Sequence, residues 1–342
     1  MQLPKTHYEA AYQYLNSRGM LDFFSDLEKI YGSDPSFEGF ATYIQDSLPN
    51  DVNPSQLMNY TNVWYHLFHV KHSGNKIYYV MPALAARLAT TSLNIDTYFI
   101  KSPFKEIFVQ IDPGLFSIRD TDGSQVPVTG FYVNFKEIGD SKMLRIMACA
   151  LLKPTEQIPF NDTTFYFKVV FGPGKLNEQL DKYLQLNMYN RIEELEQFGG
   201  ASNIEYVHDF ISFVLNTLLY ITSKNPDLIP QNPDNFCSRL DRVKSAGKKR
   251  KLFQKASRAT QHRIYVLGSK FRDTKNDLIG IKSAGGIGAW KLTQRVLVTG
   301  YWRGQWYGSE KDGSKHQETI WVDGYEKGPE FADLVNSTYI VK

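Results

Sequence analysis

Apolar residues recur at helical spacing through much of the first hundred residues. Between residues 8 and 31 they form one helical face, which is broken near Gly19. The turn NPS around Pro54 is a helix-start signal, and the segment that follows, QLMNYTNVWYHLFHV, is too densely apolar for a helix surrounded by solvent. A further short helix is expected in VMPALAARLATTSL, with Pro82 near its start. This pattern predicts a mainly helical region over residues 1–100.

The pattern then changes to alternation at every second position. The segments EIFVQID, GFYVNFKE and TTFYFKVVFG alternate in this way, and DTDG at residues 120–123 is a turn signal. Such segments predict an antiparallel sheet with one covered face. Two apolar helical patterns follow, over residues 176–195 and 204–219, and an Asn-Pro pair ends the second. Residues 101–225 are therefore expected to form a central sheet with two helices.

The last third of the chain divides into a polar stretch and a β-rich stretch. Residues 226–262 are polar and basic, as in a linker. Beyond them HRIYVLGSKF, TQRVLVTGYW and TIWVDGYEKG have the character of strands separated by glycine, which predicts a small β-module rich in aromatics over residues 263–342. The predicted fold class is α+β: a helical N-terminal region, a central antiparallel sheet with packed helices, and a small C-terminal β-module.

Composition narrows the class of protein. The 342 residues carry a net charge of only +3, so no global field attracts nucleic acid. Two cysteines are too few for a disulfide framework and fit a reducing interior. The N-terminus lacks the pattern of a secretory signal, and no apolar run approaches ~18 residues. We therefore expect a cytoplasmic protein of a bacterial host cell, with no membrane partner.

The histidines do not form a metal-binding pattern. His66, His69 and His72 recur at three-residue intervals, but no cysteine or acidic ligand lies nearby at metal-site spacing. We expect packed or surface histidines there. His208 and Asp209 form a pair that metal-dependent phosphohydrolases use, but one such pair is weak support for a site.

Other chemical signals have structural interpretations. VVFGPGKLNEQL lacks the spacing of a nucleotide-binding loop, and a tight strand-to-helix turn accounts for it. SAGGIGAW is not followed by a helical pattern and is expected to be a loop. Cys149 lies in an apolar run, where a buried, inert thiol is expected. No catalytic constellation, metal or cofactor is predicted, which counts against an enzyme.

The linker is strongly basic. Nine cations stand against the single acid Asp241 between residues 239 and 258. Four consecutive cations would suit a phosphate backbone, whereas a solvated, disordered linker is the alternative. The candidate RNA-binding residues are Lys248, Lys249, Arg250, Lys251, Lys255 and Arg258.

The second candidate site is the ring-rich segment TGYWRGQWYG at residues 299–308. On a strand, Trp302 and Trp306 would lie on one face and two tyrosines on the other. Two rings on each face exceed the needs of a small core, so some are expected to stack on bases or peptide side chains; pure packing is the alternative. The candidate binding residues are Tyr301, Trp302, Arg303, Gln305, Trp306, Tyr307 and Trp321.

The segment VLVTGYWRGQWYGSEKDGSKHQETIWVDGYEKG resembles the C-terminal module of a family of phage and plasmid proteins that includes a type V-A anti-CRISPR. Upstream, FVLNTLLYITSKNPDL and HRIYVLGSKF are similar to that family's helix and strand, and the order of the central strands also follows it. Tyr301 stands where the anti-CRISPR relative has a histidine, so a role of that histidine need not transfer.

The resemblance implies a non-catalytic, anti-CRISPR-like accessory protein of a mobile element. Such a protein would bind a nascent polypeptide or the translating ribosome–mRNA complex and so suppress a host defence protein, with the central sheet and its helices receiving the peptide. The alternative is an RNA-cleaving or RNA-modifying, toxin-like enzyme that uses His262, Arg263, Arg303 or His316 near the scissile phosphate.

Overall fold

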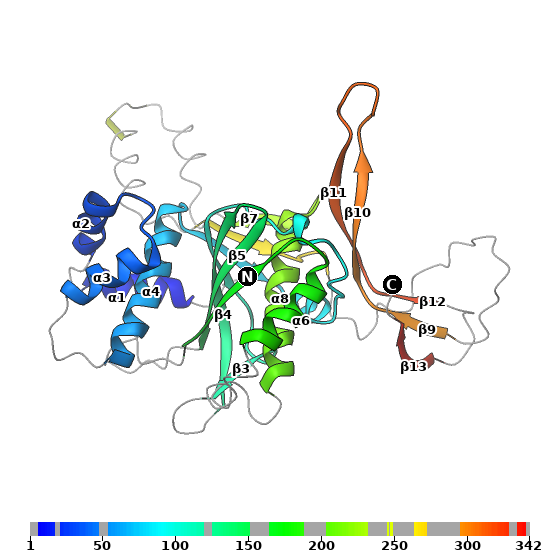
Figure 1. Cartoon of the computed structure of the whole chain (residues 1–342), viewed down its shortest axis with the longest axis horizontal. Coiled ribbons are helices and arrows are strands. Elements are labelled where there is room, and N and C mark those ends of the chain that lie inside the picture. The colour runs from blue at the N-terminus through cyan, green and yellow to red at the C-terminus, as the bar shows by residue number, and fades with distance from the viewer. Residues whose placement is uncertain are drawn as a thin grey trace.

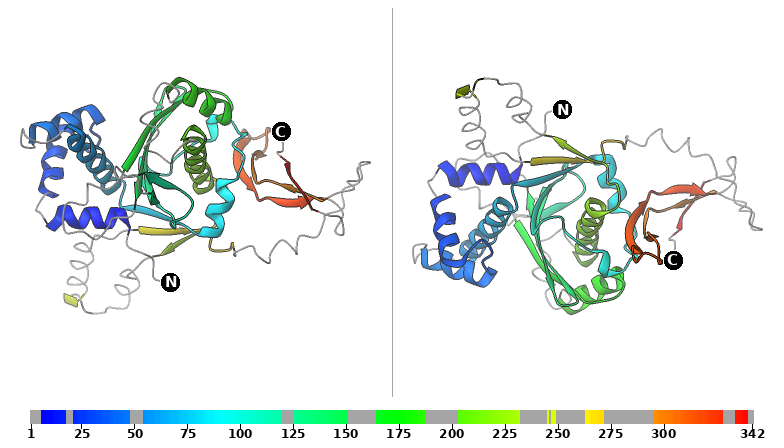
Figure 2. Two further views of the ribbon diagram at one scale, coloured as in Figure 1. Left: turned by 90° about the horizontal axis from the view of Figure 1, so that it is seen from below. Right: turned by 90° about the horizontal axis from the view of Figure 1, so that it is seen from above.

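The fold is α+β, as the sequence predicts. The computed structural model describes residues 6–17, 21–47, 54–119, 125–150, 164–187, 203–231, 245, 247–248, 263–271, 295–327 and 334–339. A central sheet lies between two groups of helices, and the C-terminal strands lie at the end of the molecule opposite the N-terminal helices (Figures 1 and 2). No helix of the described segments is long and apolar enough to cross a membrane.

In the described residues, eight strands form the central sheet. Seven follow the order β6-β5-β4-β2-β1-β8-β7, and β3 pairs with β4. The strands are β1 (Lys76–Val80), β2 (Glu106–Gln110), β3 (Ser117–Arg119), β4 (Gln125–Ile138), β5 (Ser141–Ala150), β6 (Thr164–Phe171), β7 (Leu228–Gln231) and β8 (Arg263–Leu267). β2, β4 and β6 correspond to the three alternating segments, and they belong to the antiparallel half of the sheet.

Strand β1 makes the sheet mixed rather than antiparallel throughout. It pairs in parallel with both β2 and β8. All five residues of β1 are buried, so the strand shows no alternation that the sequence pattern could reveal. The segment that contains β8 was predicted to lie in the C-terminal β-module. It instead extends the central sheet between β1 and β7.

Helices cover both faces of this sheet. One face packs against α5 (Pro82–Ala89), α6 (Leu176–Asn187) and α8 (Asn203–Thr222), with strand residues such as Val109, Phe131 and Ile146 between them. The other face packs against the N-terminal helices through Phe108, Tyr132 and other side chains. These helices are α1 (His7–Ser17), α2 (Leu21–Tyr31), α3 (Phe37–Ser47) and α4 (Pro54–His72).

The segment that the sequence marked as too apolar for solvent is α4, and most of its described side chains are buried. The thiol of Cys149 is buried, as predicted, and it lies on the side of the sheet that α4 covers. Because helices cover both faces of the sheet, β4 and β5 have apolar side chains on both sides of the strand.

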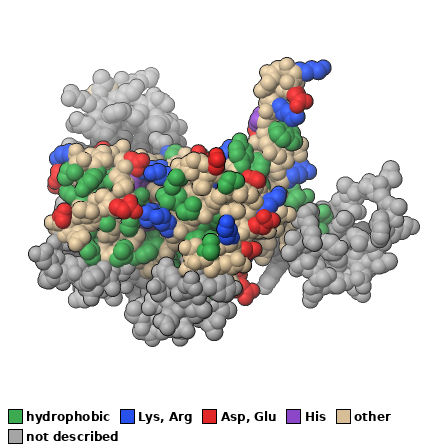
Figure 3. Space-filling model, viewed as in Figure 1, with side chains coloured by type: hydrophobic (Ala, Val, Ile, Leu, Met, Phe, Trp, Pro, Cys, Tyr) green, Lys and Arg blue, Asp and Glu red, His purple; other side chains and the backbone are tan. Residues whose placement is uncertain are grey.

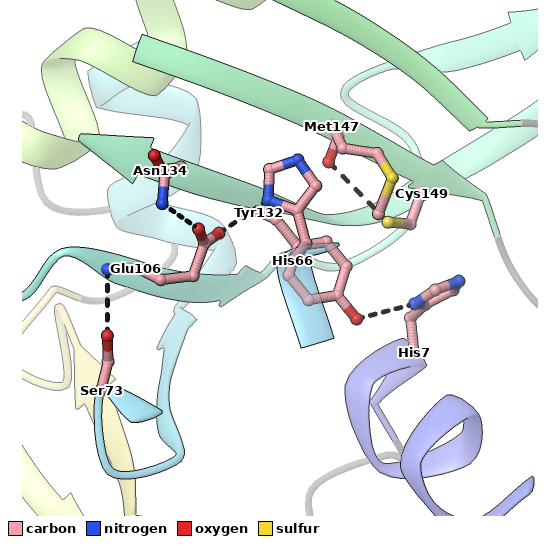
Figure 4. Close-up of polar contacts among 8 residues, drawn as sticks. All are labelled: His7, His66, Ser73, Glu106, Tyr132, Asn134, Met147 and Cys149. Atoms are coloured by element: carbon pink, nitrogen blue, oxygen red, sulfur yellow. Dashed lines mark hydrogen bonds and ion pairs between the residues drawn. The ribbon is translucent and has the colours of Figure 1, made fainter. Parts of the chain in front are cut away.

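A buried polar cluster lies between α4 and the sheet (Figure 4). His66 Nδ1 lies 2.8 Å from Glu106 Oε1, and Asn134 Nδ2 donates to Glu106 Oε2 at 2.8 Å. Close by, His7 Nδ1 lies 2.9 Å from the Tyr132 hydroxyl. Burial raises the pKa of Glu106, although His66 and Asn134 both oppose this shift. The cluster satisfies polar groups that would otherwise be costly in the core.

The C-terminal strands form two small sheets beside the central body. β10 (Tyr301–Tyr307) and β11 (His316–Val322) pair as an antiparallel ribbon that projects away from the body (Figure 1). The second sheet contains β9 (Arg295–Val298), β12 (Tyr325–Lys327) and β13 (Leu334–Tyr339). We refer to the first of these as the β10–β11 ribbon.

The base of the β10–β11 ribbon is fixed to the body by a buried amide. Trp302 Nε1 donates to Asn216 Oδ1 of α8 at 2.7 Å, while Asn216 Nδ2 donates to the carbonyl oxygens of Leu88 and Thr91, each at 2.9 Å. Asn216 is fully buried. Trp321 Nε1 also donates to Thr91 Oγ1, at 3.3 Å. One side chain thus joins α8, the end of α5 and the ribbon.

Replacing this amide should destabilise the fold strongly. Asn216→Leu keeps the volume but leaves the Trp302 indole N–H and the Thr91 carbonyl without their partner and removes a second bond to the Leu88 carbonyl, so we expect a loss of about 3 kcal/mol in the free energy of unfolding. Urea unfolding of the two proteins measures this. The matched control is Asn187→Leu, because exposed Asn187 at the end of α6 makes one local bond to Tyr183. Equal effects of the two substitutions would contradict the role of Asn216.

The buried histidines should make stability depend on pH. Burial, with help from His66 and His72, lowers the pKa of His69 to about 3. The unfolded chain therefore takes up a proton near pH 6.5 that the folded chain does not, and stability is lost as pH falls below that value. We expect His69→Phe to reduce the difference in unfolding free energy between pH 7 and pH 5 by about 2 kcal/mol.

Urea unfolding at the two pH values tests this expectation. The new packing and the lost contact with the Pro35 backbone act at both pH values, so they cancel in the difference. An unchanged pH dependence in His69→Phe would show that His69 is not the titrating group.

Candidate functional site

The β10–β11 ribbon carries all of the ring-rich candidates. The two strands pair from Tyr301 opposite Val322 to Tyr307 opposite His316. Alternate residues face opposite sides, so Trp302, Gly304 and Trp306 share one face. Gly304 lies against the body at mid-strand: a Cβ there would be 2.9 Å from the Phe99 ring. The missing side chain lets the ribbon lie close to the 3-10 turn η1 (Thr97–Phe99).

The tryptophans of the ribbon have different environments. Trp302 is only 4% exposed and packs into the main core, and Trp321 is half-buried against Tyr220 and Phe271. Trp306 is 56% exposed, although it lies on the same face as Trp302. The burial of Trp302 argues against its predicted contact with a partner, because its indole is already bonded to Asn216. Trp306 is the tryptophan available for such a contact.

Cations accompany the rings at the outer end of the ribbon. Lys315 Nζ lies 5.1 Å from the ring centroid of Trp306, and Lys224 Nζ lies 3.2 Å from that of Tyr307. The Tyr307 and His316 rings are 6.3 Å apart. Such contacts hold ring and cation together while leaving ring edges accessible to a partner.

The opposite face of β10 is partly open. Tyr301, Gln305 and Tyr307 are half-buried there, and Arg303 is exposed. Lys224, two residues after α8, contacts this face at Tyr307 and Glu318, whereas Asn216 of α8 contacts the Trp302 side. A face that combines tyrosine, arginine and glutamine has the composition of a binding surface.

The charges of the outer ribbon nearly balance. Lys224 Nζ and His316 Nε2 both contact the Glu318 carboxylate, at 2.8 and 3.0 Å. Hydrogen bonds to the Ser314 carbonyl and to Glu318 raise the pKa of His316. Both basic and acidic side chains lie near the tip (Figure 3). Between residues 303 and 318 the basic residues are Arg303, Lys311 and Lys315, and the acidic ones are Glu310, Asp312 and Glu318. Affinity at this surface must therefore come mainly from rings and hydrogen bonds.

The predicted RNA-binding residues fall largely outside the described segments. Lys248 is exposed. The other five, Lys249, Arg250, Lys251, Lys255 and Arg258, lie outside the described residues, so their role stays a prediction.

The structure does not bring together the residues of the enzymatic alternative. Arg263 lies on β8 in the central sheet, and Arg303 and His316 lie on the ribbon. His316 is opposite Tyr307, which lies four positions beyond Arg303 on the same strand. Arg303 and His316 are therefore roughly 13 Å apart along the ribbon. His262 is not among the described residues.

Other chemical candidates are occupied by structural contacts. His66 and Glu106 are an acid–base pair, but their side chains are 2% and 0% exposed, so no substrate reaches them in this conformation. In the turn before α6, the Gly174 carbonyl accepts from Thr97 N, as expected for a structural turn. No three His, Cys, Asp or Glu side chains within the described residues converge as a metal site would require.

Sequence reasoning missed the contacts that organise this surface. Asn216 and Lys224 were not singled out, although each touches the ribbon. Asn216 has a visible signal, because it is the lone amide in the apolar run FVLNTLLYI. Lys224 has none, since its partner Glu318 is distant in sequence.

Comparison with known proteins places the chain in a family. The model of the AcrVA2-like family, described as the anti-CRISPR type V subtype A2 family, matches residues 78–325. A solved structure described as the crystal structure of AcrVA2 aligns with a TM-score of 0.53 and 12% identity, covering 94% of this chain and 99% of that one. At this identity the alignment supports a shared fold. The search of curated proteins returned no match. The matched residues run from β1 to β12 and include the whole ribbon, and the chain belongs to the anti-CRISPR type V subtype A2 family.

Proposed function

We propose that this protein suppresses production of a host defence protein in the bacterial cytoplasm by binding a nascent polypeptide, its translating mRNA, or both. Membership of an anti-CRISPR family supports a role in suppressing host defence. The protein would act without catalysis, as an accessory factor of a phage or plasmid. The identity of the suppressed protein would be set by residues of this chain that contact the target.

The observation that carries this proposal is the exposure of Trp306 on a projecting ribbon. A 56% exposed tryptophan leaves a large apolar surface in water, a cost that a bound partner would remove. Both faces of the central sheet are covered by helices, so an extended chain has no open sheet face in the body. The ribbon, rather than the central sheet, is therefore the contact surface that we propose.

Within this surface the residues have different roles. Trp306 and Tyr307 would stack on bases or on peptide side chains, with Tyr301 on the same face as Tyr307. Arg303 and Gln305 would supply hydrogen bonds that fix the orientation of the partner. Trp302 and Trp321 would act only through the position that they give to the ribbon.

Truncating the exposed ring tests the proposal. We expect Trp306→Ala to reduce cosedimentation with translating ribosomes about tenfold or more, because central aromatic residues dominate such contacts. Its unfolding free energy should change by less than about 0.5 kcal/mol, since the side chain is on the surface. The measurement is sedimentation through sucrose from a translation extract programmed with the target message, followed by quantification of bound protein.

The matched control is Tyr31→Ala on α2, which removes a 40% exposed ring far from the ribbon. This variant should cosediment like the unmodified protein. If the unmodified protein is never enriched on translating ribosomes, nascent chains or message, the proposed function is wrong. Equal binding by Trp306→Ala would instead remove the ribbon from the proposal.

A further inference from the structure

A small cavity lies on the other side of the molecule, where the chain enters α3. Its volume is about 120 Å³, and its walls come from residues 34–38, from α4, and from the strand ends of β2, β4 and β5. The charged and amide side chains that line it are Asp34, Glu38, Lys105, Asn134, Lys136 and Arg145. No contact of this cavity with the β10–β11 ribbon is found among the described residues, so its chemistry is independent of the proposed function.

Strand register brings the cations to this place. Asn134 of β4 is opposite Arg145 of β5, and Arg145 is opposite Lys168 of β6. Directly opposed residues share one face of a sheet. Lys136 lies two residues beyond Asn134 and so has the same orientation, while Lys105 immediately precedes β2. Strands β4, β5 and β6, with the residue before β2, therefore carry a group of basic residues to one end of the face that α1–α4 cover elsewhere.

The carboxylates of the cavity do not neutralise these cations firmly. Asp34 pairs with Lys105, and Glu38 Oε1 lies 3.4 Å from Arg145 Nη2. The acidic side chains are 65% and 75% exposed, whereas those of Lys105 and Arg145 are 31% and 16% exposed. Solvent-exposed ion pairs contribute only about 0–1 kcal/mol, so an anion inside the cavity can displace them.

Glu106, which follows Lys105 in the chain, is already engaged by other partners. Glu106 accepts from Asn134 and lies against His66, and it is fully buried. Lys136 forms no ion pair with any side chain in the described part of the protein, which leaves one exposed cation at the cavity without a counter-charge.

The environments of Arg145 and Lys105 make the cavity suited to an anion that carries more than one acceptor oxygen. The Arg145 guanidinium lies 4.3 Å from the Phe37 ring, a contact that holds its plane while leaving N–H groups free at its edge. Burial, with a smaller effect of Lys136, lowers the pKa of Lys105 to about 8. A bound anion would offset both the burial and the repulsion, and so would favour the charged lysine.

We propose that this cavity binds a phosphate group, with oxygens that accept from Arg145, Lys105 and Lys136. A tetrahedral oxyanion can use cations that approach from β4, from β5 and from the residue before β2, whereas a planar carboxylate would be satisfied by the arginine alone. The group would be either a free phosphate monoester or a phosphate of an RNA backbone, which present the same oxygens to the cavity.

Calorimetric titration of the full-length protein with inorganic phosphate tests the site. We expect saturable binding of one phosphate per chain. Lys136→Gln, a substitution on the surface, should weaken it about fivefold, as loss of one nearby charge predicts. Asp34→Asn and Glu38→Gln should act in the opposite sense and tighten binding by about three- to fivefold, because they remove competing carboxylates. Lys182→Gln, on α6 across the sheet, is the matched control and should change nothing.

The sign of the acidic substitutions separates binding from structure. A purely structural ion-pair cluster would be destabilised by Asp34→Asn or Glu38→Gln and would gain no phosphate affinity, which would overturn the proposal. Absence of saturable phosphate binding, or binding that Lys136→Gln leaves unchanged, would also overturn it. Trp306→Ala should bind phosphate normally, so failure of the ribbon and failure of the cavity are distinguishable.

Two further titrations identify the source of the phosphate. If adenosine 5′-monophosphate binds as tightly as a short single-stranded RNA, with the same loss in Lys136→Gln, the ligand is a free phosphate monoester. If the RNA binds more tightly and shows a steep salt dependence, the cavity holds one phosphate of a longer backbone. Either result supports a phosphate site. If neither adenosine 5′-monophosphate nor the RNA binds, the phosphate site is contradicted.

Discussion

One buried amide determines how the surface of this protein is presented. Asn216 accepts from the Trp302 indole and donates to two carbonyl oxygens beside α5. Because these groups are removed from water, the Trp302 indole N–H and the Thr91 carbonyl depend on Asn216 for a hydrogen bond. The ribbon therefore cannot move away from α8 without exposing unsatisfied polar groups in the core. This constraint turns a two-stranded hairpin, which is marginally stable by itself, into a rigid projection.

Much of the fold could be predicted from the sequence, most clearly where burial is one-sided. Helix α6 and strand β6 show clear periodicity because one side of each packs on the core while the other is more exposed. Strand β1 is buried on both faces and gives no such signal, and the same covering conceals much of β5. The parallel pairing of β1 with β8 joins segments that are far apart in the chain, and no local pattern reports it.

The candidate surfaces show the same limit. The ring cluster is visible in the sequence, but its division into a buried Trp302 and an exposed Trp306 depends on Asn216, which is 86 residues from Trp302. The phosphate cavity is less visible still, since Lys105, Lys136 and Arg145 are brought together only by strand register. Local sequence thus identifies residues of the types that commonly bind partners or ligands. Long-range contacts then determine which of these residues are accessible for binding.

The separation between the fixed base of the ribbon and its exposed end has an evolutionary consequence. Substitutions at the base are constrained by the core, whereas Arg303 and Trp306 can change with little cost to folding. A phage protein that must follow a changing host gains from such an arrangement. If the ribbon binds as proposed, its exposed residues can diversify while the buried base and the scaffold beneath it persist.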